Sequence, residues 1–271
     1  MLGKDGNFYG TTSLGGASNG GTVFRLTPPY LLAASGTAFS YQITINVQTL
    51  VRWGDNYAGE STVPTGLSGV AAIIGGSYCS SAVKTDGTVV GWRSNDGGKT
   101  SIPAGLTNVV ALATGYSHNL ALKANGTVTA WGTNAWGQTS VPSGLSSVAA
   151  ITVNNFSSLA LKVDGTVVGW GYNTHGEVTI PVGLNNVVAI SGGESHNLAL
   201  KADGTVVAWV SNGYGQTSVP TNLTSVVSIS AGENFSLALK ADGTVVSWGG
   251  NGPSAVPPAG LNNVTAISGG R

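Results

Sequence analysis

Two glutamates, Glu194 and Glu233, are the side chains of this sequence best placed for acid–base chemistry. A pair of carboxylates on either side of a glycosidic bond can hydrolyse it, one acting as the acid and the other as base or nucleophile. The two are 39 residues apart (233 − 194), which is also the period of a repeat that runs through the chain. Because the repeat by itself explains their proximity, we expect no catalytic residue, and a glycan-active enzyme that uses both glutamates is an alternative.

Two histidines occupy one position of the same repeat. His118 and His196 stand where other copies carry Cys79, Ser157 and Phe235. They are 78 residues (196 − 118), or two repeats, apart, so they cannot both approach one metal ion to roughly 2 Å. The pattern favours a repeated structural hydrogen bond, and we expect neither a metal site nor a cofactor.

Aromatic side chains in loops are the better candidates for function, because aromatic residues dominate the centres of recognition surfaces. One set of loops precedes the second strand predicted for each repeat and includes Tyr78, Tyr116, Phe156, Glu194 and Glu233. Another set follows the repeat tryptophan and includes Tyr57, Trp136, Tyr172, His175 and Tyr214. Equivalent positions of successive repeats lie on one face, so we expect a protein or glycan to bind there, with Trp136 and Tyr214 as first anchors.

Six tryptophans indicate the architecture that must position these loops. They are spaced by 39 residues without a slip, at Trp53, Trp92, Trp131, Trp170, Trp209 and Trp248. A strict period of this length is typical of one supersecondary unit repeated around or along an axis. Each tryptophan ends a segment with apolar alternation, so we expect all six to be structural residues of the core.

The pattern of each repeat predicts four short strands. Val187–Ser191 is rich in small apolar residues, and apolar residues alternate in Asn197–Lys201 and Thr205–Trp209, as in strands with one buried face. Asp203-Gly204 lies between the last two segments and predicts a tight hairpin with positive φ at both positions. A fourth strand is expected in the segment that ends at Pro220, on an edge, because proline lacks an amide donor. Four strands per unit indicate the blade of a propeller.

The ends of the chain predict how the ring closes. Val264–Ser268 is a sixth copy of the first strand, and Ser40–Trp53 aligns without a gap on His196–Trp209. We therefore expect residues 40–53 to supply the second and third strands of the blade whose first strand is Val264–Ser268. The predicted fold is all-β, a six-bladed β-propeller of 39-residue repeats closed by the N- and C-terminal strands. An incomplete seven-bladed propeller is the alternative.

The sequence divides into two parts of different composition. Residues 1–36 contain GKDGNFYGTTSLGGASNGGTVFRLT, which looks like a unit of a separate glycine-rich repeat of large exported bacterial proteins, followed by a linker at Pro28-Pro29. Residues 37–271 are assigned to the propeller. This organisation predicts part of a larger exported bacterial protein, extracellular or at the cell surface, although Met1 is not followed by a signal-peptide pattern.

Charge is sparse and balanced in this chain, with 8% charged residues and equal numbers of Lys+Arg and Asp+Glu, 11 each. Without a basic footprint, nucleic acid is not an expected partner. No apolar stretch reaches the roughly 18 residues of a membrane span, so membrane insertion is not expected either. The single cysteine, Cys79, cannot form an internal disulfide, and we expect a monomer that is held together by its core.

Two phrases carry a family resemblance: GYSHNLALKANGTVTAWGTNAWGQTSVP at Gly115–Pro142 and GESHNLALKADGTVVAW at Gly193–Trp209. They resemble the bacterial branch of the regulator of chromosome condensation repeat family, and at this period they are similar to the secreted propeller-type β-lactamase inhibitory proteins. The resemblance implies a propeller that hosts exchange factors, inhibitors and other functions. The leading prediction is a non-enzymatic binding module. A β-lactamase-inhibitor-like protein and a structural spacer of an adhesin are alternatives.

Overall fold

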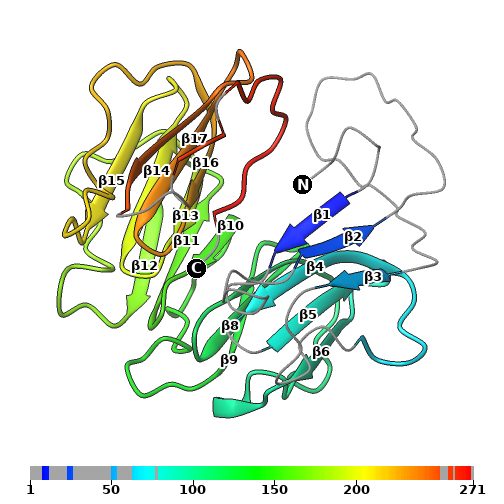
Figure 1. The fold of residues 1–271 in the computed structure, drawn as a ribbon. Helices are drawn as coiled ribbons and strands as arrows, with labels where there is room; N and C mark the ends of the chain where they lie inside the picture. The colour runs from blue at the N-terminus through cyan, green and yellow to red at the C-terminus, as the bar shows by residue number, and fades with distance from the viewer. Residues whose placement is uncertain are drawn as a thin grey trace.

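The computed structural model describes residues 8–11, 23–26, 50–53, 63–76, 79–250, 256–258 and 260–269. The strands in these residues form six antiparallel sheets of three strands each (Figure 1). The described residues also contain a single turn of 3-10 helix, η1 (Asp96–Gly98), and none of their helices is long and apolar enough to span a membrane. The predicted all-β fold is confirmed.

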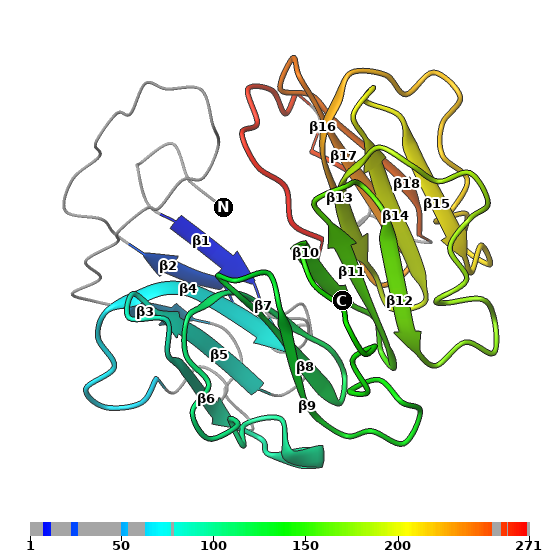
Figure 2. The same ribbon diagram turned by 180° about the vertical axis from the view of Figure 1, so that it is seen from behind.

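Five of the sheets repeat one arrangement of inner, middle and outer strands. The inner strands are β4 (Val70–Gly76), β7 (Val109–Thr114), β10 (Val148–Val153), β13 (Val187–Gly192) and β16 (Val226–Ala231). The middle strands are β5 (Cys79–Lys84), β8 (His118–Lys123), β11 (Ser157–Lys162), β14 (His196–Lys201) and β17 (Phe235–Lys240). The outer strands are β6 (Val89–Arg93), β9 (Val128–Gly132), β12 (Val167–Gly171), β15 (Val206–Val210) and β18 (Val245–Gly249). Inner strands of successive sheets contact one another, so the sheets follow each other in chain order (Figures 1 and 2).

Middle strands β5, β8, β11 and β14 are buried on both faces, whereas Phe235 and Leu237 of β17 are partly exposed. Every side chain of β14 is buried except that of the terminal Lys201, which is partly exposed. The expectation of one buried face was wrong here, because β14 packs between two sheets, with Ala199 in a cluster with Leu159 and with Leu198 in a cluster with Val226. The apolar clusters therefore lie between sheets, as where Leu159 of β11 and Val187 of β13 meet Trp209 of β15.

Tryptophans of the 39-residue period are the next-to-last residues of the outer strands and belong to these clusters. The buried ones are Trp92, Trp131, Trp170, Trp209 and Trp248. The side chain of Trp53 lies outside the described residues, although the backbone of that residue ends β3 (Leu50–Trp53). The tryptophan period thus marks the packing of sheet against sheet, in which a large flat side chain covers much apolar surface.

The turn between middle and outer strands differs in one respect from its prediction. In the turn after β11, only Gly165 has a positive φ, of 80°, so the expectation of positive φ at both residues was wrong. Asp164 instead accepts hydrogen bonds from the amide and hydroxyl of Thr166, the amide at 3.0 Å. Together with a hydrogen bond from Lys162, these contacts hold the pKa of the Asp164 carboxyl below its usual range. The aspartate is therefore the cap of the turn.

The proline segments form no strand in the described residues, so the prediction of a fourth strand per blade was wrong. In the loop before β16, the amide of Leu223 donates to the Pro220 carbonyl at 3.0 Å. The amide of Val219 donates to the Thr217 carbonyl at 3.0 Å, and the side chain of Asn212 accepts from the Thr217 amide at 2.9 Å. These backbone groups are satisfied within the loop, and no ladder with a neighbouring strand forms.

The sixth sheet is built from the N-terminal residues. It contains β1 (Phe8–Thr11), β2 (Val23–Leu26) and β3 (Leu50–Trp53). Val23 of β2 pairs with Trp53 of β3, and β1 contacts β4. The strand beside β3 thus comes from residues 1–36 and not from residues 40–46, so that part of the closure prediction was wrong. Residues 27–49, with the predicted linker, lie outside the described ones, and the domain limit at residue 36 stays a prediction.

The last described segment lies beside β16 without forming a strand. The amide of Gly269 donates to Ser230 Oγ at 2.8 Å, just as the amide of Ala231 donates to Ser191 Oγ at 2.9 Å between β16 and β13. Val264–Ser268 therefore occupies an inner position, but the expectation of a strand was wrong, because no described residue forms a backbone ladder with it. The choice between six blades and an incomplete seven-bladed ring stays a prediction.

Candidate recognition face

Strand pairing brings the two predicted loop sets to one end of the sheets. Ser157, at the start of β11, pairs with Gly171, at the end of β12. The amide of Tyr172 then donates to the Phe156 carbonyl at 3.0 Å, which joins a loop of the second set to one of the first. We call this end the loop face, comprising residues 94–98, 115–117, 133–137, 154–156, 172–176, 193–195, 211–215 and 232–234.

Four aromatic side chains form a continuous strip on the loop face. Tyr116 packs edge-on against Phe156 with ring centroids 5.9 Å apart, and Phe156 against Tyr172 at 6.4 Å. Tyr172 in turn packs edge-on against Trp136 at 5.1 Å. Trp136 is 55% exposed and Tyr116 is 50% exposed. The aromatic strip, Tyr116–Phe156–Tyr172–Trp136, therefore presents a large apolar surface to solvent on two adjacent sheets.

Buried amide or carboxylate side chains hold the second-set loops from below. Gln138 Oε1 accepts a hydrogen bond from the amide of Trp136 at 2.8 Å, and Gln216 Oε1 accepts one from the amide of Tyr214 at 2.9 Å. Both glutamines are fully buried. Neither glutamine is among the predicted site residues, although each follows its candidate by two residues and both occupy one position of the repeat.

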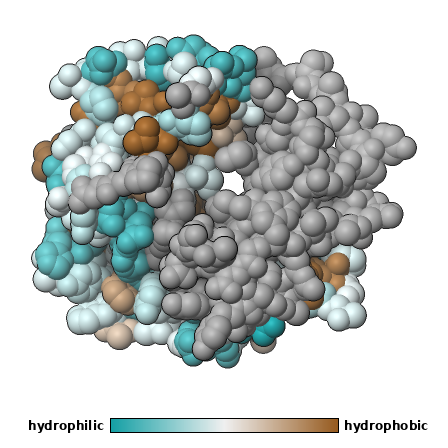
Figure 3. Space-filling model, viewed as in Figure 1, coloured by the Kyte–Doolittle hydropathy of each residue, from teal (hydrophilic) through white to brown (hydrophobic). Residues whose placement is uncertain are grey.

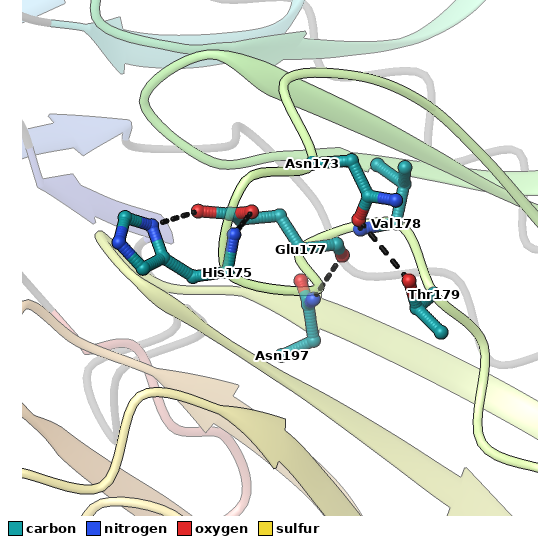
Figure 4. Close-up of polar contacts among 6 residues, drawn as sticks. All are labelled: Asn173, His175, Glu177, Val178, Thr179 and Asn197. Atoms are coloured by element: carbon teal, nitrogen blue, oxygen red, sulfur yellow. Dashed lines mark hydrogen bonds and ion pairs between the residues drawn. The ribbon is translucent and has the colours of Figure 1, made fainter.

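Glu177 takes the same position below His175 (Figure 4). Its Oε2 accepts from the His175 amide at 2.9 Å, and its Oε1 lies 3.3 Å from His175 Nδ1. Asn197 of β14 donates to the Glu177 carbonyl at 2.8 Å, while Asn173 closes the same loop by accepting from the Val178 amide at 3.0 Å. The exposed imidazole of His175 is thus held 6.1 Å from Tyr172, at the border of the aromatic strip.

Lys99 is the equivalent residue before β7 and supports the other end of the strip. It is buried, and its Nζ donates to the Tyr116 carbonyl at 3.0 Å. Its own carbonyl accepts from Trp131 Nε1 at 2.8 Å. Burial raises the pKa of the nearby Cys79 thiol, against the lowering effect of the Lys99 charge. The single cysteine is therefore a buried packing residue in its neutral form.

The two glutamates lie on neighbouring sheets of the loop face, but their carboxylates have separate partners. Asn155 Nδ2 donates to Glu194 Oε1 at 3.1 Å, whereas Asn234 Nδ2 donates to Glu233 Oε1 at 3.2 Å. The amide of Glu194 also donates to the Gly232 carbonyl at 3.3 Å, which ties the two turns together. The structure thus places the glutamates in adjacent turns without joining them as an acid–base pair.

The remaining predicted site residues divide between the loop face and the undescribed part of the chain. Tyr214 lies on the loop face after β15 and is 46% exposed. Tyr57 and Tyr78 lie outside the described residues.

Hydrophobic side chains are also exposed elsewhere on the molecule. Figure 3 shows them among hydrophilic ones over the part of the view that β13 to β17 occupy. Val163 and Val182 are exposed away from the loop face and offer controls.

Beneath the loop face, two buried histidines connect adjacent sheets. His196 Nε2 lies 2.9 Å from Ser236 Oγ of the next sheet, and that hydroxyl donates to the Gln216 carbonyl at 2.8 Å. A serine hydroxyl has one proton, so Ser236 must accept from the imidazole, which places the proton on Nε2. His118, Ser158 and Gln138 repeat this series at 2.9 and 2.9 Å. The predicted structural hydrogen bond is confirmed.

Glycine three residues before each of these histidines makes room for the ring. A Cβ on Gly193 would lie 2.6 Å from His196 Cε1 and would meet the Gly232 carbonyl. One of the repeats without a histidine carries Asn154 and Ser157 at the two positions, and the buried Asn154 side chain takes up space near the turn. Glycine with histidine and asparagine with serine are therefore two ways of filling one volume.

We predict that Gly193→Ala lowers the free energy of unfolding by about 1–3 kcal/mol, because the added methyl group must displace backbone or the His196 ring. The matched control is Gly213→Ala, where a Cβ meets nothing within 4 Å and stability should change by no more than about 1 kcal/mol. Urea denaturation measures both. Equal stability of the two variants would contradict the packing described.

Comparison with known proteins identifies a matching repeat family and solved structures of similar fold. Residues 109–138, 148–177, 187–216 and 226–252 match the regulator of chromosome condensation (RCC1) repeat. Among solved structures, Prp20p from Saccharomyces cerevisiae is 19% identical with a TM-score of 0.68, over 91% of this chain and 72% of that chain. The ectodomain of the Physcomitrella patens receptor kinase CR4 is 20% identical with a TM-score of 0.69, over 96% and 68%. The likeness confirms the propeller fold. No curated protein sequence matches the chain significantly.

Proposed function

Because residues 109–252 consist of repeats that belong to the regulator of chromosome condensation family, we propose that this chain is a non-enzymatic module that binds a protein through its loop face. The observation that carries the proposal is the aromatic strip, which keeps Trp136 and Tyr116 exposed although both stand on loops anchored from below. Aromatic residues held in place in this way lose little conformational entropy on binding. Fold neighbours support a binding role, since Prp20p has binding properties to Gsp1p and histones.

The geometry of the strip favours a protein over a glycan. A sugar ring stacks on a flat aromatic face that is open to solvent. The rings of Tyr116 and Phe156 are inclined by 68°, and those of Tyr172 and Trp136 by 76°, so each presents an edge to the next. Such edge-to-face clusters leave an uneven apolar surface into which the side chains of a partner can pack, as in protein interfaces.

The setting of the module is part of the proposal. We place it outside the cell or on its surface, within a larger exported bacterial protein, as a monomeric unit. This is supported by the low content of charged residues, 8%, and by the glycine-rich composition of residues 1–36. Cell fractionation with an antibody against the chain would test it, and recovery in the cytoplasm alone would contradict it.

The test of binding compares the chain with a Trp136→Ala/Tyr172→Ala variant on purified class A β-lactamases, cell-surface proteins and cell-wall glycans. We expect a protein ligand whose affinity falls at least about tenfold in the variant, since interface aromatics of this kind are binding hot spots. The control is Val163→Ala/Val182→Ala, which changes exposed apolar residues elsewhere and should retain the affinity.

Three outcomes separate the alternatives. Protein binding that is lost only in the strip variant, with unchanged thermal unfolding, supports the proposal. Binding that is equal in both variants contradicts the assignment of the loop face. Binding of glycans alone would overturn the choice of a protein ligand, and the absence of any ligand for a folded sample would favour a spacer.

A further inference from the structure

We infer that the segment bound by the loop face is basic: after its apolar contacts with the aromatic strip, it places an arginine or lysine side chain against Glu194 and Phe156. The inference rests on the proposed function and specifies its partner. It is argued from the distribution of paired and unpaired carboxylates and from the position of Glu194 beside the strip.

Carboxylates at the two ends of the sheets differ in their partners. At the turns between middle and outer strands, each aspartate forms an ion pair with the lysine two residues before it, as Asp164 does with Lys162 at 2.8 Å. The other such pairs are Lys84–Asp86, Lys201–Asp203 and Lys240–Asp242. On the loop face, Asp96, Glu194 and Glu233 form no ion pair with any described residue. Among the described residues, the carboxylates without an ion pair are thus on the face that carries the exposed aromatic residues.

The cations near the loop face that belong to described residues do not alter this balance at Glu194. Lys99 is buried and donates to the Tyr116 carbonyl, beneath the opposite end of the strip. Arg93 ends β6, three sheets before the turn that carries Glu194. His175 faces Glu177, which is its own carboxylate partner. A partner that brings positive charge to Glu194 would therefore be attracted without displacing a cation of the described part of the chain.

Glu194 is positioned at the side of the aromatic strip. Its Oε1 accepts from Asn155, the residue that precedes Phe156 in the turn between β10 and β11. The carboxylate is partly buried, and Oε1 is the oxygen that Asn155 engages, so Oε2 has no partner among described residues. Arginine suits this junction, because a guanidinium group stacks on an aromatic ring while it donates to a carboxylate.

The order of the turns along the loop face predicts which side chains a bound segment meets first. Backbone contact between Glu194 and Gly232 places the turn before β17, with Glu233, directly after the Glu194 turn. A segment that crosses the loop face from Trp136 would meet the aromatic strip on the sheets of β7 to β12 first, and the two carboxylates on the sheets of β13 to β18 afterwards. The matching partner sequence therefore has apolar or aromatic residues next to two basic residues.

The experiment selects peptides from a random phage-displayed library on the immobilised chain, after removal of phage that bind the Trp136→Ala/Tyr172→Ala variant. Selected peptides are then synthesised with arginine or with neutral citrulline, and their affinities are measured by calorimetry for wild type and Glu194→Gln. Asp164→Asn is the matched control, because it also removes one negative charge and Asn125 already serves in the same turn of another repeat.

We expect the selected peptides to be enriched in arginine and lysine, and citrulline or Glu194→Gln to weaken binding by about fivefold to thirtyfold. Raising the salt concentration should weaken the same complexes, whereas Asp164→Asn should leave them unchanged. Peptides without basic residues, or affinities unaffected by Glu194→Gln, would overturn the inference but leave the loop face as a binding site. Failure to obtain any peptide that distinguishes wild type from the strip variant would instead contradict the proposed function.

Discussion

Trp170→Ala is expected to lower the free energy of unfolding by roughly 3–5 kcal/mol. Trp170 is 6% exposed and packs in one cluster with Leu122 of the preceding repeat and with Val148 of its own sheet. Its removal leaves a cavity between two sheets that are held on both sides and cannot collapse onto it. Urea denaturation followed by circular dichroism measures the effect, and a loss below about 1 kcal/mol would show that the side chain is not part of the core.

Phenylalanine substitutions distinguish the contribution of the tryptophan ring to stability from that of its hydrogen bond. Trp170 Nε1 donates to the Gln138 carbonyl at 3.0 Å, whereas Trp209 Nε1 is buried without a partner among the described residues. Trp170→Phe should therefore cost about 1 kcal/mol more than Trp209→Phe, because only the first change removes a hydrogen bond. Equal losses in the two variants would mean that the Gln138 contact contributes nothing measurable.

Acid is expected to destabilise the chain by about 3 kcal/mol between pH 7 and pH 4 through His196 alone. Burial lowers the pKa of His196 from 6.5 to about 4. Because the folded-state pKa lies below the unfolded value, the unfolded chain binds the proton first, and stability is lost as the pH falls from about 6.5 to about 4. Protonation would charge a ring whose Nδ1 is buried without a hydrogen-bond partner in the described part of the chain.

The control for this prediction is His196→Gln, which removes the titrating group. Its free energy of unfolding, measured in urea at several pH values, should fall less steeply than that of the wild type between pH 6.5 and pH 4. The turn aspartates titrate in a lower window: hydrogen bonds from Thr88 and Thr244 lower the pKa values of Asp86 and Asp242 to about 2. Parallel curves for both proteins above pH 4 would contradict the burial of a neutral His196.

Much of the fold could be predicted from the sequence, because its strongest signals are local and repeated. The 39-residue period of tryptophan can be recognised without knowledge of distant contacts. The same is true of the strands and the glycine turn in each repeat. The hydrogen bond of His118 and His196 could be inferred for the same reason, since two copies at one position imply one structural role. Each of these features could be recognised from the repeat itself, although the serine that bonds His196 lies 40 residues further along the chain.

Predictions failed where a feature depends on which segments meet. The proline segments contain strand-forming residues, but Asn212 and its equivalents satisfy their backbone locally. Residues 40–46 have the pattern of a middle strand, yet β2 pairs with β3. Several segments compete to pair with a strand that is distant in the chain. The residue pattern of one segment does not show which segment pairs in the end.

The sequence by itself determined the repeat, the strands and the candidate residues of both loop sets, because periodicity and turn chemistry are properties of neighbouring residues. Only the tertiary structure decided that the two sets share one face, that Tyr116, Phe156, Tyr172 and Trp136 form a strip, and that Glu194 and Glu233 take separate amide partners. The physical reason is that antiparallel pairing folds the end of one strand beside the start of another, and side chains from different repeats then compete for the same space and the same hydrogen bonds.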